Sequence, residues 1–252
     1  MANTSKKSLG VGIALAVSFL VVLLLIFSPI FGEGKNGLVF ADDLFNKLSK
    51  GSSYFIPKVA KENEKFMGKM FTVSFKVDKK PEDKPGDTEK RAERAAKLFT
   101  VNQGAKAEVK GSEIKIEGDL GLVLKAALED SDVMFKNEGD KIKTKYEAAM
   151  ATDDVKQMFR QWYNVLPQIS KEFAKDKKIE ESKIVSTVSK KAVETAYNYY
   201  GVEAQKVSEK ALLMTGLLVF YVIYTMWWGF AIFYIFDGIG LTMSKSKVKK
   251  EV

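Results

Sequence analysis

The chain has 252 residues, a formal net charge of +8, and neither histidine nor cysteine. It therefore lacks the side chains used most often for zinc binding, disulfide bonds and proton transfer near neutral pH. We expect a protein that is not an enzyme and that has no catalytic residues and no bound metal or cofactor.

An apolar run over residues 9–31 contains no ionisable side chain. The hydrocarbon core of a bilayer is roughly 30 Å thick, and about 20 residues cross it in a helix. The run therefore predicts a transmembrane helix that stays in the mature protein. A cleaved signal peptide is the alternative, because Val39 and Ala41 are small residues suited to cleavage before Asp42, but an h-region of about 7 to 15 residues would be shorter.

A second apolar run covers residues 211–243 and contains one charged side chain, Asp237. It is longer than one untilted crossing requires, so we expect a tilted helix or an interfacial end near Asp237. The run is rich in aromatic residues, and interfacial aromatic belts explain only those near its ends. These residues are Phe220, Tyr221, Tyr224, Trp227, Trp228, Phe230, Phe233, Tyr234 and Phe236.

Two glycines in this run, Gly216 and Gly229, offer points where another helix can approach closely. Together with the aromatic residues they predict lateral packing against the membrane helices of other subunits, whereas plain anchoring in lipid is the alternative. The residues expected to bind such a partner are Gly216, Tyr221, Tyr224, Trp227, Trp228, Gly229 and Phe233.

Lysines flank both apolar runs, and their placement predicts the topology. Lys6 and Lys7 lie in the tail 1–8, and four more lysines lie in the tail 244–252. By the positive-inside rule both termini are cytoplasmic, so residues 32–210 lie outside, in the periplasm if the membrane is a bacterial inner membrane. Acidic and basic side chains alternate through 42–210 without a clustered basic patch, which argues against a nucleic-acid partner.

Between the two runs the chain predicts a linker and then a small α/β domain. The linker, residues 32–69, carries a membrane-proximal helix with Leu44, Phe45 and Leu48 on its apolar side. Strict alternation from Phe71 to Val77 then predicts a strand with one buried face. It opens the predicted domain, residues 70–147.

The rest of that domain follows as a helix, a hairpin, a second helix and a last strand. Asp87 and Asp119 are candidate N-caps for the two helices, and Lys110-Gly111 is the hairpin turn. Residues 142–146 supply the last strand, although their lysines leave little to bury and a helix is the alternative. The predicted order βαββαβ is a ferredoxin-like fold. Glu129, Asp130 and Asp132 are interpreted as a solvated acidic turn.

Residues 148–210 predict a helical hairpin and stalk. Apolar residues recur at helical spacing over 152–176, with Pro167 inside, and again over 179–200. We expect the second helix to continue into the apolar run as a stalk with a weak point at Gly201, and a helix that ends at Gly201 is the alternative. Three tyrosines fall partly off the apolar stripes and are candidates for a periplasmic partner surface: Tyr163, Tyr197 and Tyr200.

The chain thus predicts an α+β protein in which two transmembrane helices flank an extracytoplasmic domain. We expect a non-catalytic structural or assembly subunit of a larger bacterial inner-membrane or envelope complex, in contact with the lipid bilayer and other membrane subunits. A periplasmic sensor or ligand-binding module that signals laterally is the alternative. The layout also resembles that of bacterial polysaccharide co-polymerases, which implies chain-length regulation, but the chain has no proline after Pro167, whereas that family carries a proline-rich segment around its second span.

Overall fold

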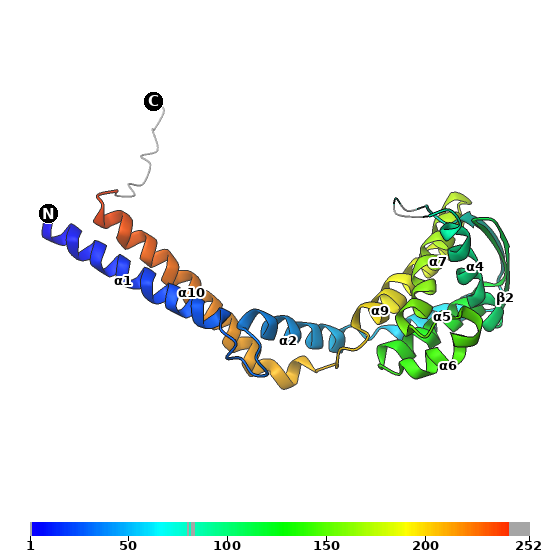
Figure 1. Cartoon of the computed structure of the whole chain (residues 1–252), viewed down its shortest axis with the longest axis horizontal. Coiled ribbons are helices and arrows are strands. Elements are labelled where there is room, and N and C mark those ends of the chain that lie inside the picture. The colour runs from blue at the N-terminus through cyan, green and yellow to red at the C-terminus, as the bar shows by residue number, and fades with distance from the viewer. Residues whose placement is uncertain (1, 80, 82–83, 242–252) are drawn as a thin grey trace, which may run out of the picture. The chain divides into compact units, whose positions relative to one another are not determined.

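The computed structural model describes residues 2–79, 81 and 84–241, and the predicted basic tail lies outside them (Figure 1). The chain divides into two compact units. One holds the described residues of Met1–Leu48 and Gln205–Val252, and the other is Ser49–Ala204.

The first unit is a hairpin of two long helices, α1 and α10, which pack side by side (Figure 1). Both are long and apolar enough to span a membrane, so the prediction of two such helices is confirmed by length and composition. The predicted linker helix is also present as α2, with Leu44 and Leu48 buried and Phe45 exposed. The bounds are α1 (Ala2–Phe27), α2 (Gly37–Ser52, which runs on into the second unit), the 3₁₀ turn η3 (Val207–Lys210) and α10 (Ala211–Gly238).

The second unit is a three-stranded antiparallel sheet with helices, and the strand order is β1-β3-β2. Its elements are α3 (Ile56–Asn63), η1 (Glu64–Phe66), β1 (Met70–Lys76), α4 (Asp87–Val101), β2 (Ala105–Lys110), β3 (Glu113–Asp119), α5 (Leu120–Phe135), α6 (Gly139–Met150), α7 (Val155–Lys175), α8 (Ile179–Val188), the π-helical stretch η2 (Ser189–Glu194) and α9 (Thr195–Tyr199).

The three strands and the turn between β2 and β3 follow the alternation in the sequence. Phe71, Val73 and Phe75 are buried on β1, while the residues between them are exposed. Gly111 turns the hairpin with a φ of 61°, a left-handed conformation that favours glycine. Asp119 caps α5, since its Oδ1 accepts a hydrogen bond from the Leu122 amide at 3.1 Å. Asp87, in contrast, is not an N-cap, because it lies in the first turn of α4 and Gly86 precedes it.

The predicted fourth strand is wrong, and with it the four-stranded ferredoxin-like fold. Residues 142–146 belong to the helix α6, which buries Ile142, Tyr146 and Met150. These residues are four apart, so a helix places all three on one face, whereas a strand over 142–146 would leave Met150 out.

One hydrophobic core runs through the α/β elements and the late helices. Trp162 of α7 is fully buried within it and meets Phe99 of α4 edge to face, with ring centroids 6.0 Å apart. The apolar stripe predicted for α7 is confirmed, and Pro167 lies on its exposed side. Where α7 packs on α8, the Ser170 and Ser182 hydroxyls each donate to the other residue's carbonyl at 2.9 Å.

The helical run from α8 to α9 ends at Tyr199, so the predicted continuous stalk is wrong. Gly201 has a φ of 88°, and the Val202 amide donates to the Tyr199 carbonyl at 3.1 Å. The expected weak point is therefore a complete stop, in which glycine takes the left-handed conformation that ends many helices. Residues 202–206 are not helical before η3 begins.

Candidate functional site

One face of α10 is used for packing against α1. Tyr224 stacks on the Phe19 ring with centroids 4.1 Å apart, and Trp228 approaches the same ring at 4.6 Å. One turn along, the Trp227 Nε1–H donates to the Leu15 carbonyl at 3.1 Å. The contact residues of α10 recur every three or four positions, as expected of one helix face. They are Tyr224, Trp227, Trp228, Ala231, Ile235 and Gly238.

Glycine allows the two helices to approach closely at two places. A Cβ on Gly12 would lie 2.6 Å from the Ile235 nitrogen, and one on Gly238 would lie 2.6 Å from the Leu9 Cα. Small residues at helix crossings serve this purpose in membranes. Neither glycine was predicted as a packing position, although a glycine within an apolar run is a signal that could have identified Gly12.

The two glycines that were singled out, Gly216 and Gly229, lie elsewhere. No atom comes within 4 Å of the Cβ that either would carry. They are therefore not used within the hairpin and leave open positions on the outside of α10. Their role in binding another subunit stays a prediction.

The other predicted membrane residues divide between the two sides of α10. Tyr221, with 67% of its surface exposed, and Phe233, with 48%, point away from α1. Tyr224 and Trp227 are partly covered by α1, while Trp228 contacts Phe19 and is still 39% exposed. The structure thus brings Tyr224, Trp227 and Trp228 together on α1. It leaves open space at Gly216 and Gly229 and leaves Tyr221 and Phe233 exposed.

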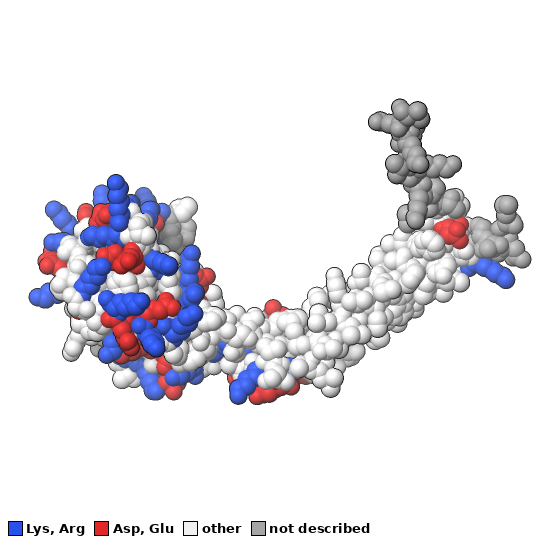
Figure 2. Space-filling view, turned by 180° about the vertical axis from the view of Figure 1, so that it is seen from behind, with Lys and Arg blue, Asp and Glu red and all other residues white. Residues whose placement is uncertain are grey.

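An apolar groove of about 600 Å³ lies beside Trp227 on this hairpin. It is lined by Leu15, Ile223, Met226, Trp227, Phe230 and Tyr234. Such a groove fits an acyl chain or the side chains of another membrane helix. The surface of the hairpin carries few charged residues, whereas the 49–204 unit carries both signs interspersed (Figure 2).

Among the three tyrosines proposed for a periplasmic surface, two lie together. The rings of Tyr163 and Tyr197 are 5.4 Å apart, and the Lys156 ammonium lies 5.5 Å from the Tyr197 ring centroid. The Tyr200 hydroxyl instead packs against Gly139, at the point where a Cβ would overlap it. Tyr163 and Tyr197 therefore form a small patch, and Tyr200 contributes to packing at the start of α6.

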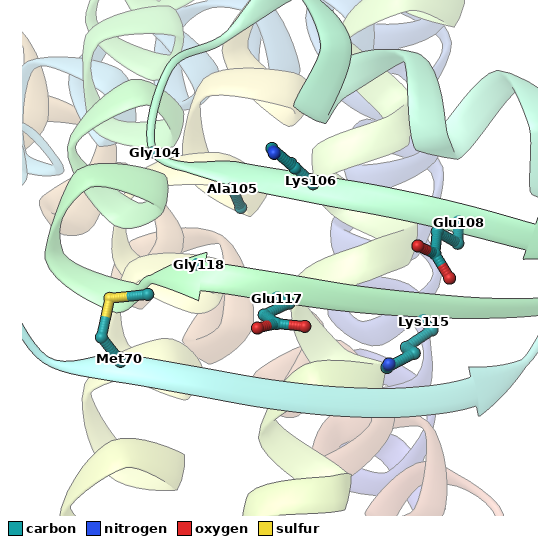
Figure 3. Close-up of a pocket in the computed structure, with 8 residues that line it drawn as sticks. All are labelled: Met70, Gly104, Ala105, Lys106, Glu108, Lys115, Glu117 and Gly118. Atoms are coloured by element: carbon teal, nitrogen blue, oxygen red, sulfur yellow. The ribbon is translucent and has the colours of Figure 1, made fainter.

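The outer face of the sheet forms a shallow hollow of about 610 Å³, lined by residues of all three strands (Figure 3). Opposite charges face each other in register across β2 and β3, as in the pairs Lys106 with Glu117 and Glu108 with Lys115. Such cross-strand pairs stabilise a sheet. The charged side chains also make this face of the sheet polar and solvent-exposed, and we assign no ligand to it.

The predicted solvated turn at Glu129, Asp130 and Asp132 is wrong, because all three residues lie in the helix α5 and Asp130 is buried. Asp130 is 3% exposed on α5 and accepts hydrogen bonds from the Trp162 indole at 2.7 Å, the Lys145 ammonium at 2.6 Å and the Tyr146 hydroxyl. Burial, together with the Asp130 charge, raises the pKa of Tyr146. The cluster joins α5, α6 and α7.

A buried lysine, Lys50, was also missed. It is 2% exposed, and its ammonium donates to the Val202 carbonyl at 2.6 Å, the Asn137 Oδ1 at 3.0 Å and the Tyr199 carbonyl at 3.1 Å. Burial lowers the pKa of Lys50. Asn137 takes a positive φ of 62° and also binds the Gly201 amide at 2.8 Å. These contacts, called the Lys50 clasp below, connect the first residues of the 49–204 unit to its last. Lys50 is one of two lysines in α2, and the sequence carries no signal that distinguishes it from Lys47.

Within residues 2–79, 81 and 84–241, no group of three or more acidic side chains lies close enough to hold a metal ion. The chain matches no protein-family model, and comparison with curated proteins and with solved structures finds no significant match. The candidate site therefore rests on geometry, and it is the outward side of α10.

Proposed function

We propose that this protein is a two-pass membrane subunit with a structural or assembly role in a larger bacterial inner-membrane or envelope complex. The hairpin of α1 and α10 anchors it, the outward side of α10 docks on the helices of another subunit, and the 49–204 unit forms a scaffold in the periplasm. In this arrangement both termini are cytoplasmic.

The observation that carries the proposal is the division of α10 into two sides. The side toward α1 already has aromatic stacking, a hydrogen bond and close glycine contacts. The outward side nevertheless keeps a glycine, Gly229, beside exposed aromatic residues such as Phe233. A helix that meets only lipid gains nothing from a glycine there, whereas a partner helix can approach closely over it.

The chemistry of the pockets agrees with a role that is not catalytic. The hollow on the sheet presents charges that already face opposite charges, and the buried carboxylate Asp130 has its oxygens occupied by three donors. A general base needs a reachable lone pair and a nearby reacting atom. Neither feature offers that arrangement.

Gentle extraction followed by native mass spectrometry tests the proposal. We expect the wild type to carry other membrane subunits in fixed stoichiometry, and Gly229→Leu or Phe233→Ala to lose them. Gly10→Leu is the matched control, because Gly10 has no atom within 4 Å of its Cβ position and lies on α1. Circular dichroism checks that each variant keeps its helices.

The outcomes separate the alternatives. A ring of identical subunits would favour a chain-length regulator of the co-polymerase type. A lone monomer would contradict docking through α10. So would other subunits that co-purify with Gly229→Leu and Phe233→Ala as they do with the wild type. Reporter fusions test the topology independently. A reporter on either terminus that is active in the periplasm would contradict the proposed orientation.

A further inference from the structure

A groove of about 480 Å³ lies between α3 and α5, entirely within the 49–204 unit. Its floor is apolar, since Ile56 and Leu128 are buried there and Pro57 and Ala60 extend it. Small-molecule sites have about 300–1,000 Å³ and combine an apolar lining with a few polar groups. The size and lining of this groove are those of such a site.

One wall of the groove contains a buried polar atom without a partner. Asn63 is 3% exposed, and its Nδ2 donates to the Gly121 carbonyl at 2.8 Å. Its Oδ1 is buried and accepts no hydrogen bond from any residue that the structure describes. The opposite orientation of the amide would set two acceptor oxygens against each other, so Gly121 fixes Oδ1 as the free atom. Asn63 therefore needs a donor.

The charges around the groove also favour a donor that is positively charged. Glu64, Glu129 and Asp132 line it, against the single cation Lys125. Asp132 is already bound by the Tyr54 hydroxyl and the Lys136 ammonium, each at 2.5 Å, and Lys125 is only loosely paired with Glu129 at 3.9 Å. Glu64 has no ion pair with any described residue, and it directly follows Asn63. The uncompensated charge at this wall is thus negative.

We propose that the groove between α3 and α5 binds a small organic cation with a compact apolar body and a primary ammonium group. The apolar body lies on Ile56, Ala60 and Leu128. The ammonium donates to Asn63 Oδ1 and is attracted by the Glu64 carboxylate. A donor at a buried acceptor and a cation beside a carboxylate are each favourable, and one ammonium provides both.

The test uses the full chain in lipid nanodiscs and 4-fluorobenzylammonium as the probe, followed by ¹⁹F NMR, with empty nanodiscs as the blank. The anion 4-fluorobenzoate, which is similar in size and carries the same fluorinated ring, reports the preference for positive charge. We expect saturable binding of the ammonium that exceeds binding of the anion by at least about tenfold, the ratio expected when a charged donor finds a buried acceptor.

Four variants locate the binding. Ala60→Trp fills the groove and should abolish it, and Asn63→Leu should weaken it by about tenfold through loss of the acceptor. Glu64→Gln removes one charge from the wall and should weaken it by about threefold. Glu62→Gln removes the same charge from an exposed position of α3 outside the groove and should leave binding unchanged.

Circular dichroism shows whether each variant folds, and Glu64→Gln, a change at an exposed side chain, keeps the test informative if Asn63→Leu does not fold. Equal binding of the anion and the ammonium would overturn the proposal. So would undiminished binding by Ala60→Trp, or equal losses for Glu64→Gln and Glu62→Gln.

Discussion

The Trp227 indole donates its Nε1–H to the backbone carbonyl of Leu15, 3.1 Å away on the facing helix of the hairpin. Hydrogen bonds between membrane helices contribute about 0.6 kcal/mol on average and up to about 1.7 kcal/mol. Trp227→Phe should therefore weaken the α1–α10 hairpin by about 1 kcal/mol. Thermal unfolding in micelles, followed by circular dichroism, measures this loss of stability.

Trp228→Phe is the matched control for that change, because Trp228 contacts the Phe19 ring rather than the α1 backbone. Trp228→Phe keeps an aromatic ring and breaks no hydrogen bond to α1, so it should reduce the stability of the hairpin less than Trp227→Phe does. An equal loss for the two variants would show that ring area, and not the hydrogen bond, stabilises the hairpin.

Gly12 should tolerate no side chain. Its Cβ position lies 2.6 Å from a backbone nitrogen of α10, so Gly12→Leu must push the helices apart. Overpacking of this kind costs about 1–3 kcal/mol. Two residues away Gly10 has open space at its Cβ position, and Gly10→Leu should be nearly neutral. Since the chain contains no cysteine, crosslinking of a cysteine pair introduced across the hairpin can report its separation without background. Equal crosslinking in the two variants would rule out the close approach.

Lys50→Met should destabilise the 49–204 unit. The change removes the ammonium that donates to the Asn137 side chain and to the Tyr199 and Val202 carbonyls, and hydrogen bonds to charged groups contribute about 1.5–3 kcal/mol. Lys58→Met, at an exposed position of α3, is the control. Urea unfolding followed by circular dichroism measures both, and similar midpoints would contradict a stabilising clasp.

The Lys69 ammonium lies 2.8 Å from the Glu181 carboxylate, and this ion pair predicts that the stability of the protein decreases in acid. A hydrogen bond from the Lys69 ammonium, together with its charge, lowers the pKa of Glu181 in the folded protein. The carboxylate therefore contributes stability above its ordinary pKa and loses that contribution as the pH falls through the lowered one. Glu181→Gln should be less stable by about 0.5 kcal/mol at neutral pH. The difference from the wild type should disappear in acid, and a difference that persists there would have another cause.

Most elements of the fold could be predicted from periodicity. Phe71, Val73 and Phe75 on β1 and the apolar stripe on α7 are buried as the spacing indicates. The prediction of a fourth strand was wrong because it considered only residues 142–146, without Met150. The spacing of Ile142 and Tyr146 alone fits a strand and a helix equally well. In the helix, Tyr146 also bonds to Asp130 and Asn102, and no local pattern contains these tertiary contacts.

The candidate site could be predicted only in part. Composition identified α10 as an apolar helix that is unusually rich in aromatic residues, but the sequence could not divide these residues into those that contact α1 and those that face outward. That division depends on Phe19 and Gly12, residues of a helix about 200 positions earlier in the chain. Long-range polar contacts such as those of Asp130 and Lys50 were missed for the same reason.

The contact between Lys50 and Val202 brings together the two ends of one folded segment. A segment whose ends meet can be cut out and grafted into a surface loop of an unrelated host without stretching either junction. The chain already has this arrangement, since residues 49–204 are inserted between the two halves of the helical hairpin. A fragment with both boundaries at this clasp can therefore be designed to leave out the two long apolar helices.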